Sequence, residues 1–194
     1  MSNHKHLPYR RRSIRLPGYD YTQAGAYFVT LCTQRRECLF GDIVNGEMVM
    51  NDAGRLVGKC WSDIPIHFLR VELDEFVIMP NHVHGIVVIT TGTGTACRAH
   101  TTIERFGRPV AGSIPTIMRS FKSAVTKRIN EMRNNPGNKL WQRNYFEYVV
   151  RDDDVLLKIR EYISNNPLKW EFDKENPAAM KPAPGKKPEE SWMI

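Results

Sequence analysis

Two histidines separated by one residue are the part of this sequence best suited to chemistry. His82 and His84 flank Val83 in the run Phe76-Val-Ile-Met-Pro-Asn-His-Val-His-Gly-Ile-Val-Val-Ile89. The run predicts a strand, a turn at Pro80-Asn81, and a second strand that opens on the histidines. Because alternate side chains of a strand share a face, both imidazoles should project together. Such a pair could form half of a metal site, although paired histidines are also common as surface or hydrogen-bonded features.

A second group of reactive residues lies near the end of a predicted helix, where Tyr162 precedes Asn165 and Asn166. At about 100° per residue, Asn165 lies roughly 60° from Tyr162 around the helix axis and Asn166 roughly 40°. Either carboxamide can therefore share a face with the phenol. A phenol is a potential nucleophile and an amide oxygen a potential metal ligand. The same spacing also fits a core-edge tyrosine followed by an ordinary Asn-Asn-Pro helix end.

The elements that must position these residues alternate between strands and helices. Ala26–Thr33 is β-branched and aromatic, which predicts a strand buried on both faces. Asn45-Gly46 predicts a hairpin. Further strands are expected over 71–79, 82–89 and 140–150, and helices beginning at Asn51 or Asp52, near Ser113 and at Asp152. This order predicts an α+β protein with a ferredoxin-like antiparallel sheet and helices packed on one face.

Composition indicates one domain with two tails. The chain has 194 residues, and we divide it into a basic arm (1–24), a catalytic domain (25–170) and a Pro- and Lys-rich tail (171–194). No apolar run is long enough to span a membrane, so no membrane partner is expected and a cytoplasmic location is the default. The four cysteines form no Cys-x-x-Cys pair, and neither disulfides nor a cysteine zinc site is expected.

Basic residues are clustered, with a formal net charge of +7 at pH 7. The arm carries Arg10, Arg11, Arg12 and Arg15 with tyrosines nearby, a mixture that suits phosphate contacts and base stacking. The helix after Ser113 carries further basic residues, Arg119 and Lys122 among them, largely off its apolar stripe. A solvated arm and a solvated helix face are the plain alternatives.

Five segments together resemble one protein family. Met79-Pro-Asn-His-Val-His-Gly85 resembles the HUH motif (histidine, hydrophobic, histidine) of single-strand DNA transposases and relaxase-like nucleases. Ile159-Arg-Glu-Tyr-Ile-Ser-Asn-Asn-Pro-Leu-Lys-Trp170 resembles the tyrosine helix of the REP-associated tyrosine transposases. The other matching segments, in order, are Arg11-Arg-Ser-Ile-Arg-Leu-Pro-Gly-Tyr-Asp-Tyr21, Ala26-Tyr-Phe-Val-Thr30 and Leu140-Trp-Gln-Arg-Asn-Tyr-Phe-Glu147. The resemblance covers roughly residues 10–170.

The resemblance implies an HUH endonuclease fold and a DNA-cleaving activity. His82, His84 and Asn166 would hold a divalent cation, Mg²⁺ or Mn²⁺, and Tyr162 would be the nucleophile. Insertion-sequence relatives usually carry glutamine where this chain has Asn166, so the third ligand departs from their pattern. Cleavage would leave a 5′-phosphotyrosine and a free 3′-hydroxyl, and reversal would rejoin the strand. Tyr145 and Tyr148 are poorer candidates because they precede the helix.

The implied substrate is single-stranded DNA beside a REP-type hairpin. The arginines of the arm and the basic helix face would bind the hairpin, and cleavage would lead to transposition or recombination. The protein could act as a monomer or a homodimer. Two alternatives stay open: a catalytically silent hairpin-DNA-binding regulator, and a metal hydrolase that activates water.

Overall fold

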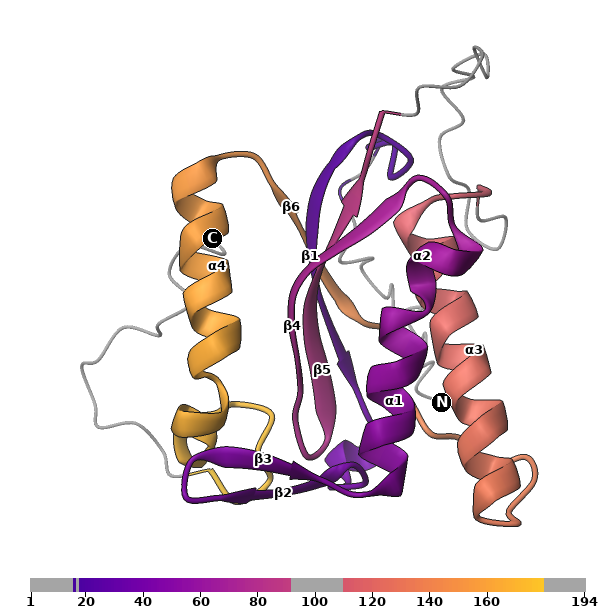
Figure 1. Ribbon diagram of the computed structural model, residues 1–194, viewed down its shortest axis with the longest axis vertical. Coiled ribbons are helices and arrows are strands. Elements are labelled where there is room, and N and C mark those ends of the chain that lie inside the picture. The colour runs from indigo at the N-terminus through magenta and orange to yellow at the C-terminus, as the bar shows by residue number, and fades with distance from the viewer. Residues whose placement is uncertain (1–15, 17, 92–109, 180–194) are drawn as a thin grey trace, which may run out of the picture.

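The computed structural model describes residues 16, 18–91 and 110–179, and its centre is a four-stranded sheet (Figure 1). The strands β1 (Gly25–Cys32), β4 (Val71–Ile78), β5 (His82–Ile89) and β6 (Phe146–Val150) lie in the order β4-β5-β1-β6, and each neighbouring pair is antiparallel. The helix α1 (Asp52–Ser62) connects β1 to β4, and α3 (Ile114–Met132) connects β5 to β6. This order is the ferredoxin-like topology, so the predicted α+β fold class is confirmed.

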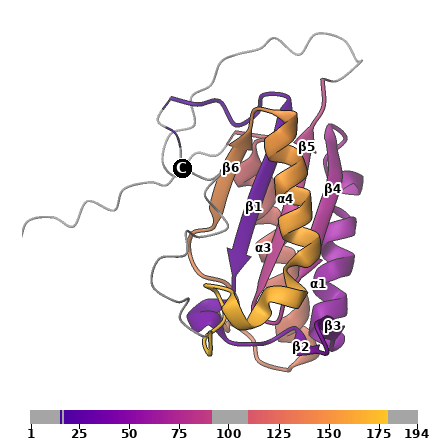
Figure 2. The same ribbon diagram turned by 90° about the vertical axis from the view of Figure 1, so that its left-hand side faces the viewer.

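Helices cover both faces of the sheet. Alternate residues of β1, such as Tyr27 and Val29, pack in a large core cluster with α1 and α3. Phe28 points the other way and forms a smaller cluster with Ile86 and with α4 (Asp153–Asn165). Figures 1 and 2 show α4 on one side of the sheet and α1 and α3 on the other. The expected single helical face therefore describes α1 and α3, whereas α4 lies opposite and covers the second face of β1 and β5, which are buried on both faces.

The helices begin where their sequences predict. Asn51 caps α1 by accepting a hydrogen bond from the backbone N–H of Gly54, which decides between the two caps that the sequence left open. Ser113 accepts from the N–H of Thr116 at the start of α3, and Asp152 accepts from that of Val155 at the start of α4. Each side-chain oxygen satisfies one backbone donor that the first helical turn leaves unpaired.

The connecting elements are short. The strands β2 (Gly41–Val44) and β3 (Glu47–Met50) form the predicted hairpin, with Asn45 and Gly46 both at positive φ. The remaining elements are η1 (Gln34–Arg36), α2 (Ile64–His67) and η2 (Pro167–Phe172). The strand expected over 140–150 is shorter than predicted. Only Phe146–Val150 joins the sheet, and Trp141 makes a single bridge to Thr33.

Gly85 allows β5 to pack closely against α1. A Cβ at this position would lie 2.3 Å from Cζ2 of the buried Trp61 side chain, which is closer than any real contact. Trp61 in turn meets Phe121 of α3 edge-on, with ring centroids 5.2 Å apart. The strand that carries both histidines is therefore fixed from behind by a tightly packed aromatic core.

Candidate metal and tyrosine site

His82 and His84 lie side by side on the α4 face of β5. Both imidazoles are buried, and their ring centroids are 4.4 Å apart. Val83, between them, points to the opposite face and joins the core under α1 and α3. Strand alternation therefore places the two side chains together, as the sequence predicts.

Asn81 fixes the tautomer of His82. The carboxamide nitrogen of Asn81 donates to the carbonyls of Arg36 and Glu175, at 3.0 and 2.7 Å, so its oxygen faces the imidazole. That oxygen lies 2.8 Å from Nδ1 of His82, and Nδ1 must be the donor. The lone pair of His82 is consequently on Nε2, which has no hydrogen-bond partner among the described residues. A metal-ligating histidine usually donates a hydrogen bond from one ring nitrogen and coordinates the metal through the other, and His82 is arranged in this way.

His84 connects the strand to the tyrosine of α4. Its Nδ1 lies 2.8 Å from Oγ1 of Thr30 on β1, and its Nε2 lies 3.3 Å from the hydroxyl oxygen of Tyr162. The Tyr162 ring also packs edge-on against Phe28, with centroids 6.1 Å apart. The phenol therefore lies against the histidine pair, and its ring is oriented by the small core cluster.

Burial keeps both imidazoles neutral. It lowers the pKa of His82 to about 4, and the neighbouring carboxylate of Asp173 only partly opposes this. The carboxamide of Asn166 also favours the protonated form of His82, although it makes no hydrogen bond to Nε2. The pKa of His84 is held well below its usual value, again first by burial and then by His82. Neutral imidazoles are the form that coordinates a metal.

The end of α4 separates the two asparagines. Asn166 is 3% exposed and faces the histidines, whereas Asn165 is exposed to solvent. The residue closer to Tyr162 around the helix axis is therefore the one that turns inward. Of the competing phenols, Tyr145 packs against the core cluster on the other face of the sheet, and Tyr148 lies in β6 opposite Phe28.

Asp173 completes the cluster, and sequence reasoning missed it. Its Oδ2 lies 3.9 Å from Nε2 of His82 and accepts a hydrogen bond of 3.1 Å from the Asn166 carboxamide. Ligand atoms of His82, His84 and Asp173 all lie within 4.8 Å of one another. The only local signal was an acidic residue soon after the tyrosine helix, in a segment whose composition resembled a tail.

A clamp between distant segments holds Asp173 in place. Arg36, the last residue of η1, forms an ion pair of 3.1 Å with Glu175 and donates to the carbonyl of Lys174. Asn81 holds the backbone of Glu175 through the hydrogen bond already described, and Cys32 donates its thiol to the Glu175 carboxylate. The same asparagine thus orients His82 and fixes the segment that carries Asp173.

The donor set fits a divalent cation. Nε2 of His82 and Oδ1 of Asn166 are buried without hydrogen-bond partners among the described residues, a costly arrangement unless another group satisfies them. Two imidazole nitrogens and a carboxylate oxygen, with a carboxamide oxygen beside them, form a mixed nitrogen and oxygen donor set that can hold a divalent cation. These residues therefore support a divalent metal at this position.

The predicted DNA-binding residues lie elsewhere. Arg10, Arg11, Arg12 and Arg15 fall outside the described residues. Arg119 is exposed on α3, across the sheet from the histidines. Lys122 is half-buried on the same helix and donates to the carbonyls of Gln142 and Arg143, at 2.7 and 3.2 Å.

Comparisons with known proteins agree with this fold. The structure of a REP-associated tyrosine transposase bound to a REP hairpin matches it at 16% identity and a TM-score of 0.54, over 90% of this chain and 77% of that chain. A candidate transposase from Deinococcus radiodurans aligns at 18% identity over 78% of this chain and 97% of that chain, with a TM-score of 0.44, too low to define a shared fold. No family model matches the sequence.

The chain thus has the fold of the REP-associated tyrosine transposases. At the level of sequence, it is 44% identical over 168 residues to a protein of Haemophilus influenzae, covering 85% of this chain and 92% of that protein. It belongs to the same family as that protein, whose name, "Uncharacterized protein", assigns no activity. None of the described helices combines the length and the apolar character needed to cross a membrane.

Proposed function

We propose that the protein is a metal-dependent single-stranded DNA endonuclease and transposase that cleaves and rejoins DNA beside REP-type hairpins. One observation carries the proposal: the Tyr162 hydroxyl lies 3.3 Å from Nε2 of a buried histidine, beside a cluster of metal-ligating atoms. The fold shared with a transposase that was solved with a REP hairpin supports the choice of DNA as substrate.

In this mechanism Tyr162 is the nucleophile, His82 and His84 would hold the metal, and Asn166 and Asp173 would supply oxygen ligands. A divalent cation bound there would polarise the scissile phosphate and offset charge that develops in the transition state. The Tyr162 oxygen attacks the phosphorus, a 5′-phosphotyrosine bond forms, and the bond to the 3′-oxygen breaks. The departing strand keeps a 3′-hydroxyl, which can attack the phosphotyrosine in reverse, so no external energy source is needed.

The residues of the chain prepare Tyr162 for attack. Its ring packs edge-on against Phe28 and beside His84, which shortens the search for an attacking geometry. A free phenol has a pKa near 10, so the Tyr162 hydroxyl gives up its proton as it attacks, and the departing 3′-oxygen takes up a proton. Before a metal binds, the neutral His84 pairs with Thr30 through Nδ1 and with the Tyr162 hydroxyl through Nε2, so one of the two ring nitrogens donates and the other accepts.

DNA would be gripped by the arginines of the arm, Arg10 to Arg15, and by the basic face of α3 that includes Arg119 and Lys122. A monomer or homodimer and a cytoplasmic location stay predictions.

A covalent-adduct assay tests the proposal. Purified protein is incubated with Mn²⁺ and a single-stranded oligonucleotide that carries a hairpin and a label on the strand 3′ to the cleavage position. Wild-type protein should acquire the label in a denaturing gel, while Tyr162→Phe should form no adduct and cleave nothing. Tyr148→Phe is the matched control and should react like wild type.

The other outcomes discriminate between the remaining classes. Continued cleavage by Tyr162→Phe would show a hydrolase that activates water. Tight hairpin binding by wild-type protein without any adduct would show a silent regulator. Either result would overturn the proposed enzyme.

A further inference from the structure

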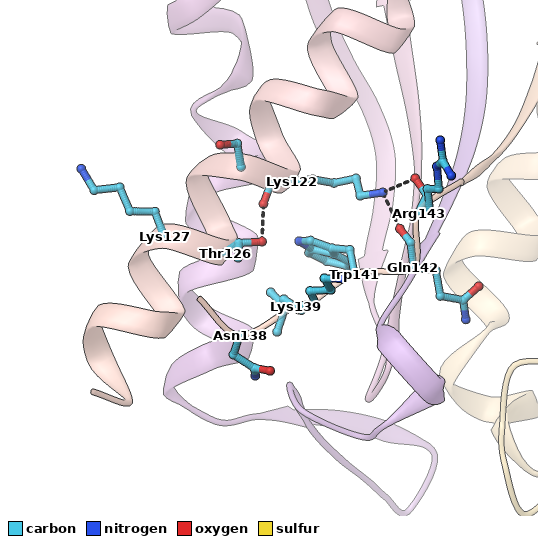
Figure 3. Close-up of a pocket in the computed structure, with 10 residues that line it drawn as sticks. Lys122, Thr126, Lys127, Asn138, Lys139, Trp141, Gln142 and Arg143 are labelled. Carbon is cyan, nitrogen blue, oxygen red and sulfur yellow. Dashed lines mark hydrogen bonds between the residues drawn. The ribbon is translucent and has the colours of Figure 1, made fainter. Parts of the chain in front are cut away.

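A pocket of about 480 Å³ lies between α3 and the segment that leads to β6 (Figure 3). Figures 1 and 2 place α3 on the face of the sheet opposite α4, whereas His84 packs against Tyr162 of α4. One wall is formed by α3 and the other by residues 138–143. Its ten lining residues include four basic side chains and no acidic one; they are Lys122, Ser123, Thr126, Lys127, Asn138, Lys139, Leu140, Trp141, Gln142 and Arg143. A concave surface with cations and no carboxylates is suited to an anion.

The floor of the pocket contains a hydrogen-bond donor with no acceptor. Trp141 is 7% exposed and packs against Phe40 and Phe121 in the core. Its indole Nε1 is buried and has no hydrogen-bond partner among the described residues. A buried tryptophan normally has an acceptor for this N–H. The indole nitrogen points toward the α3 wall (Figure 3), so an anionic oxygen admitted between the two walls would provide that acceptor.

Lys122 brings a partly dehydrated cation to the same pocket. Its side chain crosses from α3 to residues 142–143, where the ammonium donates to two carbonyls (Figure 3). Because an ammonium has three donors, one is left for a ligand. Burial lowers the pKa of Lys122 to about 8, so an anion placed beside it would favour the charged form. Lys127 and Lys139, on opposite walls, are both exposed to solvent.

The pocket is connected to the catalytic end of the sheet. Trp141 bridges to Thr33, and the Gln142 N–H donates to the carbonyl of Cys32. Cys32 is the residue of β1 that pairs with His82. The pocket is therefore about two strand spacings, roughly 10 Å, from the histidine strand, but it opens on the other face. A nucleic acid strand that passed around this edge could occupy both places.

We propose that this pocket binds a DNA backbone phosphate that is distinct from the scissile one, with Trp141 Nε1 and the Lys122 ammonium as donors and Lys127 and Lys139 as the surrounding charge. The assignment of DNA rests on the proposed function. The bound phosphate would anchor the substrate outside the catalytic face and fix which linkage reaches Tyr162.

The experiment measures binding of the full chain to a fluorescent hairpin oligonucleotide with a single-stranded extension, by anisotropy across a series of salt concentrations. Lys139→Gln removes a charge and Trp141→Phe removes the indole N–H. Lys59→Gln, which removes an exposed charge on α1, is the matched control. We expect Lys139→Gln to weaken binding about tenfold and to reduce the slope of log K against log salt by about 0.7 to 0.9. Trp141→Phe should weaken binding with little change in slope.

Neutral linkages identify the phosphate. In a series of oligonucleotides, each phosphate in turn is replaced by an uncharged methylphosphonate. At one position the replacement should weaken binding of the wild-type protein but should not further weaken binding of Lys139→Gln. Thermal unfolding of both pocket variants should confirm folded protein. The proposal that the pocket binds a phosphate would be overturned if Lys139→Gln and Trp141→Phe kept the affinity and salt slope of the wild-type protein. It would also be overturned if Lys59→Gln lost as much affinity as the pocket variants.

The adduct assay separates this inference from the proposed activity. If wild-type protein forms no adduct but the pocket variants still lose affinity at one phosphate, the pocket stands and the proposed enzyme fails. If wild-type protein forms the adduct and the pocket variants bind normally, the enzyme stands and the pocket fails.

Discussion

The two faces of the sheet have different tasks, although the same strands build both. On the α1 and α3 face, β5 contributes Val83, Gly85 and Val87 to a continuous apolar core. On the α4 face, the intervening positions carry His82 and His84, and only the second half of the strand, Ile86 and Val88, packs in the small apolar cluster. The comparison indicates that one face supplies most of the stability, which lets the other bury polar groups at a cost.

The largest loss of stability should come from a substitution of Trp61, on the α1 and α3 face of the sheet. Trp61→Ala removes the ring that packs against Gly85 and Phe121, and we expect the free energy of unfolding to fall by about 3–5 kcal/mol. Urea unfolding followed by circular dichroism measures it. Tyr162→Phe, in the other face, should change stability by less than about 0.5 kcal/mol. Similar losses for both substitutions would remove the distinction between the faces.

Asp173 tests whether the α4 face is a metal site. Asp173→Asn keeps the shape of the side chain but removes the charge 3.9 Å from His82. We expect Mn²⁺ affinity, measured by calorimetry, to fall by about 100-fold, because a carboxylate is the only anionic ligand in the cluster. Asp42→Asn, which alters an exposed carboxylate on β2, is the control and should bind Mn²⁺ like wild type. Unchanged affinity in Asp173→Asn would exclude Asp173 from the site.

Asn81 should have a smaller effect on the same measurement, because it acts through His82. Asn81→Ala removes the acceptor at Nδ1 of His82 and frees the imidazole to adopt the wrong tautomer. A loss of Mn²⁺ affinity of about tenfold is expected, at the lower end of the range for such supporting residues. If affinity fell as far as in Asp173→Asn, Asn81 would be acting through the whole clamp at Glu175 rather than through the tautomer alone.

Local periodicity was sufficient to predict the residues that come together on single elements. Strand alternation put His82 beside His84, and helix geometry put Asn166 nearer to Tyr162 than Asn165. The sequence also described β1 as buried on both faces, and that observation already required a helix on each side. Burial of β1 on both faces was therefore in conflict with our expectation of a single helical face. The conflict is resolved by α4, which covers the face opposite α1 and α3.

Asp173 could not be predicted in this way. Its position depends on the turn after Pro167 and on the ion pair between Arg36 and Glu175, two residues far apart in the chain. No local pattern reports such a contact. Composition was misleading here, because the prolines and lysines farther along made the whole segment from Glu171 resemble a tail. The domain division at residue 171 stays a prediction, but Asp173 and Glu175 are buried against the domain that holds the sheet.

The smallest effect concerns the ion pair that fastens α4 to the sheet. Arg160 makes two hydrogen bonds to Asp74 of β4, one from Nε at 3.0 Å and one from Nη2 at 2.5 Å. These contacts lower the pKa of the Asp74 carboxyl. Because both side chains are partly exposed, Arg160→Ala should cost only about 1 kcal/mol at neutral pH. Urea unfolding measures the difference, and Lys127→Ala, which breaks an exposed pair on α3, should cost less than half as much.

The stability difference between wild type and Arg160→Ala should depend on pH. A carboxyl whose pKa is lower in the folded state stabilises the protein above the pKa of the unfolded chain, near 3.9, and loses that contribution as the pH falls through the folded value. The stability difference between wild type and Arg160→Ala should therefore be constant above about pH 5 and shrink below about pH 4. A difference that stayed constant in acid would show that Arg160 contributes through packing of its side chain on α4 and not through Asp74. In that case the Phe28 cluster, with the hydrogen bonds of Ser164 to Glu75 and of Tyr162 to His84, would hold α4 to the sheet without help from Asp74.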